Sequence, residues 1–538
     1  MTAVPGEPWI LAIDLGNGGP KVAAVSLTGE ILAHGMEGVA VTIDTDGTAT
    51  QDPLEWLSAL ETAVADLADS VSRDQLHAVA ITGQWGSSVP VGADGTPVGP
   101  VLLWADTRGG RHVAPIVAGR VTVAGYAPHK VLPWLRITGG IPSNAGDDPT
   151  GHWQVLSHEL ADVGRRTSFQ LEPVDFLAAY LTGIVAATPA SMVLSWLTDN
   201  RLGATPRYVP ELVTRSRRPA DTLPPLRPTG SVQGSLLPET AERLRLPAGV
   251  PVITGIPDFH AAALGSGAVT PYATHLAVST TAWLSAPVPF KKTDIFHTIA
   301  TVPGLQPELP LVINNIDTAG AALTWLREQV IAPADGLSGG GSGIGAAGAA
   351  PPGAPPSFEA LTELAAQAPV GCEGVLFAPW LAGEHSPVAD KRIRATWLNL
   401  SLRTDRATMV RSVLEGVAFS TRWLLGHYEK FLGREVTEIR ILGGGAQSDV
   451  WCQIFADVLD VRLVRIAAPR QAQVRGVALW ARVCLGELTL SEAAGKVPLE
   501  REFVPDPDNR VEYDRLFDTY RTLYSTLRKT YRRLNASH

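Results

Sequence analysis

The chain has 538 residues, 45% of them hydrophobic and 18% charged, so it is long enough for two or three domains with sizeable cores. Its 44 Lys and Arg stand against 53 Asp and Glu, a formal net charge of −9, which argues against nucleic acid or an acidic membrane as the main partner. We interpret the three widely spaced cysteines, Cys372, Cys452 and Cys484, as buried thiols. Because the sequence has no signal peptide and no run of about 18 apolar residues, we expect a soluble, cytoplasmic protein.

The first forty residues predict two antiparallel strands joined by a glycine-rich turn. An apolar run at 9–13 ends in Asp14-Leu-Gly-Asn-Gly-Gly-Pro-Lys21, and a second strand follows at 22–27. This differs from the strand-to-helix turn of a P-loop or a Rossmann fingerprint. The glycines leave backbone N–H groups open to phosphate oxygens, and Asp14 can hold Mg²⁺ through water, with Lys21 adding positive charge. A plain hairpin with a turn aspartate is the alternative.

Helices and strands alternate along the rest of the chain, which predicts the α/β class. Helical periodicity at 53–67 precedes a strand at 76–82 that leads into Gly83-Gln-Trp-Gly86. A strand at 250–254 opens what we interpret as a second domain, so we divide the chain into 1–254 and 255–538. Residues 336–356 are almost wholly Gly, Ala, Ser and Pro, which predicts a flexible surface insertion, and 512–534 predicts a C-terminal amphipathic helix.

Two further segments have a pattern that suits chemistry. Asp258 follows the strand at 250–254 and precedes an Ala-rich helix start. A helix N-terminus stabilises a charged carboxylate, which would suit a general base acting on a hydroxyl near magnesium, although a capping aspartate is the alternative. Gly443-Gly-Gly-Ala-Gln-Ser448 lies between a strand at 438–442 and a helix, where a flat base can approach the backbone.

These segments and several others resemble, in order, the motifs of the FGGY sugar kinases, the family of glycerol kinase and xylulokinase. The resemblance spans roughly residues 9–485 and rests on Asp14–Lys21, Trp104-Ala-Asp-Thr-Arg108, Leu177–Gly183, Ala319–Arg327, Phe377–Pro387, Leu414–Phe419 and Gly443–Asp457.

The resemblance implies two actin/hexokinase-type (ribonuclease H-like) α/β domains that close over a central cleft. It implies an enzyme that uses ATP and Mg²⁺ to phosphorylate a hydroxyl of a small sugar or polyol, with a pentulose such as xylulose as the leading substrate. Asp258 would be the catalytic base, in contact with the sugar and the metal, and Asp14 would lie on the metal side. The residues implied at the nucleotide are Gly16, Asn17, Gly18, Gly19, Lys21, Ser279, Thr280, Thr281, Gly320, Thr324, Gly444, Gly445 and Asp449. Those implied at the sugar, besides Asp258, are Gln84, Trp85, Trp104, Asp106 and Trp283. If the chain assembles, we expect a homodimer.

The chain also departs from the family pattern. Asn17 replaces the usual Thr, Ser279 the usual Gly, and Phe259 a polar residue after the base, while Trp85-Gly86 stands where xylulokinase has Met-His. The sugar pocket is therefore atypical. Two alternatives stay open: a catalytically weak relative that binds nucleotide or sugar for regulation, and an actin-like ATPase.

Overall fold

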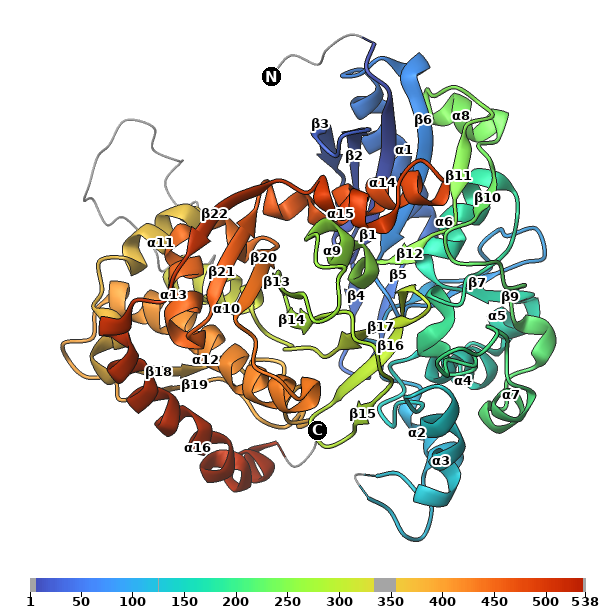
Figure 1. Cartoon of the computed structure of the whole chain (residues 1–538). Helices are drawn as coiled ribbons and strands as arrows, with labels where there is room; N and C mark the ends of the chain where they lie inside the picture. Colours follow the sequence, from blue (N-terminus) through green and yellow to red (C-terminus); the bar gives the residue numbers. More distant parts are fainter. Residues whose placement is uncertain (1–5, 124, 333–354, 536–538) are drawn as a thin grey trace.

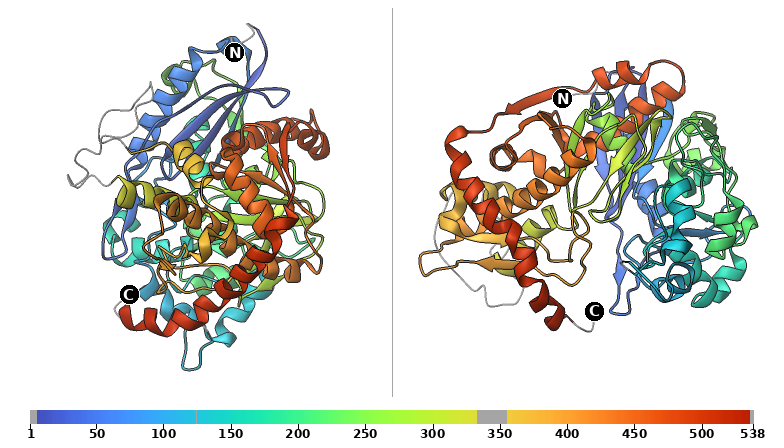
Figure 2. Two further views of the ribbon diagram at one scale, coloured as in Figure 1. Left: turned by 90° about the vertical axis from the view of Figure 1, so that its left-hand side faces the viewer. Right: turned by 60° about the horizontal axis from the view of Figure 1, so that its bottom comes forward.

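The computed structural model describes residues 6–123, 125–332 and 355–535. Most of the predicted insertion, residues 336–354, lies outside these ranges. The described chain contains two principal sheets, each covered by helices (Figure 1), which confirms the predicted α/β class. Turned views show the blue-to-green first half and the orange-to-red second half side by side, with part of the second half lying against the first sheet (Figure 2).

The first sheet has the strand order β10-β11-β6-β1-β2-β3. The bounds are β1 (Trp9–Gly16), β2 (Gly19–Ser26), β3 (Ile31–Met36), β6 (Leu76–Gly83), β10 (Val232–Ser235), β11 (Pro251–Ile253) and β12 (Ile256–Pro257). Strands β1 and β2 are antiparallel, as predicted. Because β1 and β12 both run parallel to β6, the carboxyl ends of these three strands meet at one edge of the sheet.

Alternate residues of β1 pack on opposite faces of the first sheet, as the two-residue period of a strand requires. Leu11 and Ile13 face the core formed with α1 (Pro53–Ala68), whereas Ile10 and Ala12 belong to the core shared with α9 (Asp258–Gly265) and α14 (Ala472–Cys484). Helices α9 and α14 cross very closely, since a Cβ on Gly476 would lie 2.0 Å from the backbone oxygen of Ala261. This close crossing fixes the position of α9, the helix that begins at Asp258.

The chain between β6 and β11 adds mainly helices beside the first sheet. They are α2 (Gly110–Val117), α3 (Pro128–Ile137), α4 (Pro149–His158), α5 (Ala161–Arg166), α6 (Pro173–Thr182), α7 (Pro210–Ser216) and α8 (Pro238–Leu244). Short strands accompany them or precede them: β4 (Thr42–Ile43), β5 (Ala49–Gln51), β7 (Val89–Val91), β8 (Val101–Leu102) and β9 (Phe169–Leu171).

The second sheet has the order β14-β13-β20-β21-β22. Its strands are β13 (Thr274–Val278), β14 (Ala282–Ser285), β20 (Glu438–Leu442), β21 (Arg462–Ile466) and β22 (Leu499–Phe503). Smaller sheets contain β15 (Thr293–Asp294), β16 (Ile299–Gln306), β17 (Leu309–Ile313), β18 (Leu376–Ala378) and β19 (Thr396–Leu398). The helices are α10 (Gly320–Trp325), α11 (Phe358–Ala365), α12 (Arg406–Leu432), α13 (Asp449–Leu459), α15 (Leu490–Gly495) and α16 (Arg510–Leu534). Helix α16 is the predicted C-terminal helix, and its Tyr513, Leu516 and Tyr520 are buried against α12 and its surroundings.

Two segments from the second half of the chain return to the first sheet. Strand β12 pairs with β6, and α14 packs on β1, β2 and β6. A domain division at residue 254 therefore stays a proposal. All three cysteines are free; Cys372 and Cys452 are buried and Cys484 is half-buried. Within the described ranges, no helix has the length and apolarity needed to cross a bilayer.

Candidate active site

Two carboxylates flank the end of strand β6. Asp14 lies opposite Thr82 in the pairing of β1 with β6, and Pro257, which immediately precedes Asp258, lies opposite Gly83. The pKa of Asp258 is raised to about 7, first by burial and then by the charge of Asp14, against the lowering effects of the Phe259 N–H and Lys21. The Phe259 N–H donates to Oδ1 of Asp258 over 2.7 Å. The structure thus brings the two predicted aspartates together.

Asp14 is 5% exposed and paired with a lysine. Lys21 is its direct partner across the β1–β2 hairpin, and Nζ of Lys21 lies 3.3 Å from Oδ2 of Asp14. Because the Lys21 side chain is about a third exposed, this pair adds little stability but places a cation beside the glycine-rich turn.

The turn between β1 and β2 leaves open space at Gly16 and little steric restriction at Gly18. A Cβ added to Gly16 would have no described atom within 4 Å, and one added to Gly18 would touch only the end of the Met36 side chain. Gly19 has a different requirement: its φ is +118°, and an added Cβ would lie 2.0 Å from the Glu37 oxygen. Gly16 and Gly18 can therefore expose backbone to a ligand, whereas Gly19 is needed for packing.

Three segments of the second half converge at the end of β13. The turn Ser279–Thr281 follows this strand, and the Gly320 N–H at the start of α10 donates to the Ser279 oxygen over 2.7 Å. On the other side, a Cβ on Gly443 would lie 2.3 Å from the Val278 oxygen. Beyond it, Gly444 is exposed and has no described neighbour within 4 Å of an added Cβ. The predicted nucleotide segments of the second half thus lie directly beside one another.

Two side chains predicted at this surface are already bonded within the chain. Thr324 Oγ1 donates to the Gly320 oxygen over 3.2 Å. Oδ1 of Asp449 accepts from Arg465 over 2.5 Å, and its other oxygen pairs with Arg501. The Asp449 carboxylate is therefore balanced by two cations before any ligand binds.

The segment after β6 carries Gln84 and Trp85, each tied to a distant part of the chain. The Gln84 N–H donates to the Leu15 oxygen over 2.8 Å, next to Asp14. The Trp85 indole N–H donates to the Ser191 oxygen over 2.9 Å, and its ring meets His260 edge-on at 5.7 Å. Trp85 therefore packs against α9, two residues beyond Asp258.

Trp283 connects the two halves of the site. Its ring, on β14, stacks on Phe259 with centroids 5.4 Å apart, so the residue after Asp258 contacts the strand that follows the Ser279–Thr281 turn. Trp283 is 8% exposed, and its indole N–H has no hydrogen-bond partner in the part of the chain that the structure describes.

The remaining predicted sugar residues, Trp104 and Asp106, occupy different settings. Trp104 is 37% exposed, and its indole N–H donates to Oδ1 of Asn17 over 3.1 Å. Asp106 is fully buried and holds Arg108 at 2.6 Å and the Ala49 N–H at 3.1 Å. Asp106 thus has internal partners for both oxygens, whereas Trp104 joins the glycine-rich turn to the sugar side.

Two residues that the sequence analysis did not predict also support this segment. Ser87 Oγ donates to Oε1 of Gln84 over 3.0 Å, and Oε2 of Glu172 accepts the Gly86 N–H over 3.0 Å. Burial and the charge of Asp175 raise the pKa of Glu172 well above its usual value. Ser87 could have been found from its spacing of three residues after Gln84, but no local pattern connects Gly86 with a residue so distant in sequence.

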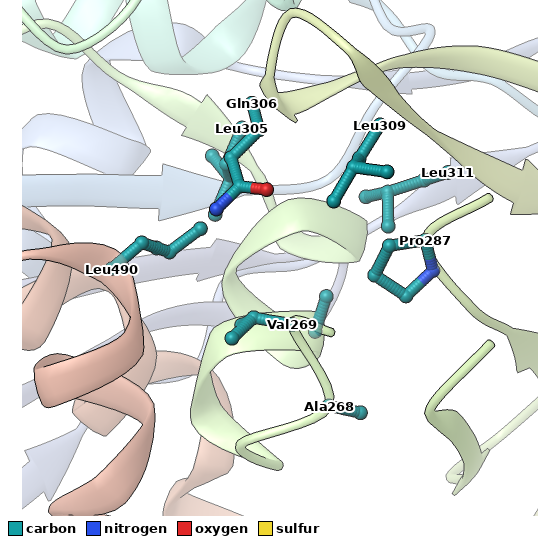
Figure 3. A pocket seen from close by; sticks show the side chains of 9 residues that line it. Ala268, Val269, Pro287, Leu305, Gln306, Leu309, Leu311 and Leu490 are labelled. Atoms are coloured by element: carbon teal, nitrogen blue, oxygen red, sulfur yellow. The ribbon is translucent and has the colours of Figure 1, made fainter. Parts of the chain in front are cut away.

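A small apolar pocket lies away from these polar groups (Figure 3). It is lined by Ala263, Ala268, Val269, Pro287, Leu305, Gln306, Leu309, Leu311 and Leu490. Its volume of about 10 Å³ is room for one water molecule, and none of the predicted site residues lines it. This pocket is too small for a sugar.

Comparison with known proteins agrees with this geometry. Residues 9–120 match the N-terminal domain and residues 272–485 the C-terminal domain of the FGGY family of carbohydrate kinases, together more than half of the chain. A xylulose kinase from Staphylococcus epidermidis is 24% identical over 528 residues, which cover 96% of each chain. Crystal structures of a ligand-bound xylulose kinase and of a gluconate kinase, both from Lactobacillus acidophilus, match with TM-scores of 0.82 and 0.81 at 20% and 19% identity, each covering 98% of this chain and 100% of the other.

These matches confirm the predicted two-domain actin/hexokinase-type fold. They also confirm a carbohydrate kinase, for which ATP is the phosphoryl donor. The chain belongs to the FGGY family of carbohydrate kinases.

Proposed function

We propose that this kinase transfers the γ-phosphoryl group of ATP to a hydroxyl of a pentulose such as xylulose, with Asp258 as the catalytic base. The observation that carries the proposal is the meeting of Asp258 and Asp14 at the ends of β12 and β1. The names of relatives such as the Staphylococcus epidermidis xylulose kinase support the substrate class. We further propose that the enzyme works in the cytoplasm.

Asp258 is suited to accept the proton of a sugar hydroxyl. Its Oδ1 holds the Phe259 N–H, which fixes the carboxylate and leaves Oδ2 for the substrate. A pKa of about 7 lies near the value at which a general base works best at neutral pH. Gln84, Trp85, Trp104 and Trp283 are the proposed sugar contacts around it: the indole rings offer apolar faces to C–H groups, and the amide offers hydrogen bonds.

The chain has residues suited to hold the two groups that the family implies, ATP and Mg²⁺. Gly16 and Gly444 leave space where a Cβ would stand, and at Gly18 only the end of the Met36 side chain is near, so these backbones can approach the phosphates and the base of ATP. We propose that Asp14 and Asp258 hold Mg²⁺. One or two carboxylates suffice for this ion, because Mg²⁺ usually keeps several waters and takes phosphate oxygens as further ligands. When bound, this ion neutralises charge on the transferring phosphoryl group.

An assay of ADP release across ketoses, alditols and aldonates tests the proposal. We expect a pentulose to give the highest kcat/KM, and mass spectrometry of the product should show one added phosphate. An alditol or aldonate with the highest kcat/KM would contradict the proposed substrate class. If sugars bind but none increases ATP turnover above the rate without sugar, the chain is a weakly catalytic binding relative instead.

A further inference from the structure

The side-chain amide of Gln84 is held in one orientation by a chain of hydrogen bonds. The backbone N–H of Trp104, which can only donate, points at Ser87 Oγ over 3.1 Å. Ser87 therefore accepts this bond and can use its own hydrogen to donate to Oε1 of Gln84 over 3.0 Å. In the reverse amide orientation Nε2 would donate to Ser87 Oγ, but the Ser87 hydrogen and the Gln84 oxygen would both lack partners in a buried place, whereas the described orientation leaves only Nε2 without one.

This orientation leaves the amide nitrogen of Gln84 as a free donor. Gln84 is 5% exposed, and its Nε2 has no hydrogen-bond partner within the described ranges. A buried amide with two unpaired hydrogens is unfavourable unless something else accepts from it. An acceptor oxygen on a ligand would satisfy this group, and because Nε2 is inaccessible to solvent in the structure, neighbouring side chains must move when such a ligand binds.

The backbone around Gln84 is fixed as well. Its N–H is bonded to the Leu15 oxygen beside Asp14, and the next two residues are held by Ser191 and Glu172. These bonds fix the backbone of this segment, and Ser87 is the group that bonds to the Gln84 side chain.

We propose that Ser87 is a positioning residue for sugar recognition: it turns the Gln84 amide so that its NH₂ group donates to one hydroxyl or carbonyl oxygen of the acceptor sugar. The proposal rests on the proposed function, in which Gln84 contacts the sugar. It assigns to Gln84 the role of donor through Nε2, the amide atom that has no partner among the described residues. The site therefore selects a sugar that carries an acceptor oxygen at this position.

The test compares Ser87→Ala, Gln84→Leu and the double variant in steady-state kinetics with the sugar that wild type uses best. We expect Ser87→Ala to raise the KM for the sugar about tenfold, the loss expected for one poorly placed hydrogen bond, with a smaller change in kcat and no change in the KM for ATP. The double variant should match Gln84→Leu within about twofold, because Ser87 acts through Gln84.

Ser88→Ala is the matched control. Ser88 is as buried as Ser87 but bonds to His152 and Gln170 rather than to Gln84. We expect it to lower the melting temperature without changing the KM for the sugar. A rise in this KM similar to that of Ser87→Ala would attribute both effects to general loosening and overturn the proposal.

A panel of singly deoxygenated sugars provides a second measurement. One of these analogues should bind wild type about tenfold more weakly than the parent sugar, and this penalty should disappear in Gln84→Leu and shrink in Ser87→Ala. If Gln84→Leu changes no sugar constant, the proposed contact between Gln84 and the sugar fails. If Gln84→Leu weakens sugar binding but Ser87→Ala does not, or if the two changes add independently, only the role of Ser87 is wrong.

Discussion

On the side of the first sheet, the proposed site presents restrained side chains beside the backbone of the β1–β2 turn. Asp14, Gln84 and Asp258 lie at the ends of three neighbouring strands, buried or half-buried, and each is bonded to Lys21, Ser87 or the Phe259 backbone. On the side of the second sheet, the site presents mainly backbone. There Gly320, Gly443 and the Ser279–Thr281 turn pack against one another, and the Asp449 side chain is already paired with arginines.

This difference gives a physical reason why enzymes with one fold can share a phosphoryl donor and yet differ in the acceptor that they phosphorylate. Backbone groups are present whatever the side chain, so a nucleotide surface built from them tolerates substitution as long as no Cβ blocks it. Where a few restrained side chains recognise the acceptor, substitution of one of them, or of a residue bonded to it, changes which acceptor binds.

The largest expected effect is on the first side. Asp258→Asn should lower kcat by about 10²- to 10⁴-fold, because a general base is lost, while ATP and sugar still bind. Asp405→Asn is a matched control, since Asp405 caps α12 through the Thr408 N–H and tests what loss of an ordinary capping carboxylate does. Stopped-flow or coupled kinetics would measure both. Turnover above about a tenth of wild type in Asp258→Asn would remove this residue from the role of base.

A pair of glycine variants tests the backbone side. Gly444→Val adds a side chain where no described atom lies within 4 Å, whereas Gly445→Val would press on Cγ1 of Val278, 2.5 Å from an added Cβ. We expect Gly444→Val to raise the KM for ATP about tenfold or more with little change in melting temperature. Gly445→Val should lower the melting temperature. If Gly444→Val leaves ATP kinetics unchanged, this glycine does not face the nucleotide.

The buried carboxyl group of Glu172 makes the folding stability of the chain depend on pH. Its pKa in the folded chain is raised by burial and by Asp175, so the folded state binds more protons than the unfolded state above the ordinary glutamate pKa. Stability is therefore lost as pH rises from that value toward the raised pKa. Glu172→Gln keeps an acceptor for the Gly86 N–H, and its stability relative to wild type should increase with pH in denaturant titrations. A stability difference independent of pH would contradict the raised pKa.

The smallest effect is expected at Trp85. Trp85→Phe keeps an aromatic ring near His260 and loses the bond to the Ser191 oxygen, at a cost of about 1 kcal/mol in stability. We expect glycerol to be a poor substrate of wild type, and the order of kcat/KM among sugars to change in the variant. An unchanged order with only a lower melting temperature would show that Trp85 is packing and does not contact the sugar.

Local patterns predicted much of the fold. The hairpin around Asn17, the strand at 76–82, the start of α9 at Asp258 and the C-terminal helix all follow from periodicity and turn residues. The return of α14 to the first sheet could not be predicted in this way, because its close crossing with α9 depends on contacts between segments about two hundred residues apart.

The contacts that support the candidate site were equally hard to predict from local patterns. Strand ends and glycines indicated Asp14 and Asp258 as candidates, and the sequence also placed Lys21 near Asp14, whereas Ser87 and Glu172 were not predicted. Gly19, predicted at phosphate, also passes close to Glu37, and Asp449, predicted at the nucleotide, is also paired with Arg465 and Arg501; neither contact could be predicted from the sequence. Hydrogen-bond partners are set by tertiary packing, which a single sequence does not record.

The most direct test of the division between the two sides is a crossed binding measurement. Calorimetry would give the Kd of the sugar alone and of a non-hydrolysable ATP analogue alone for wild type, Gln84→Leu and Gly444→Val. We predict that Gln84→Leu weakens sugar binding about tenfold and leaves the analogue within about twofold, and that Gly444→Val does the reverse. Equal weakening of both ligands in either variant would contradict the account.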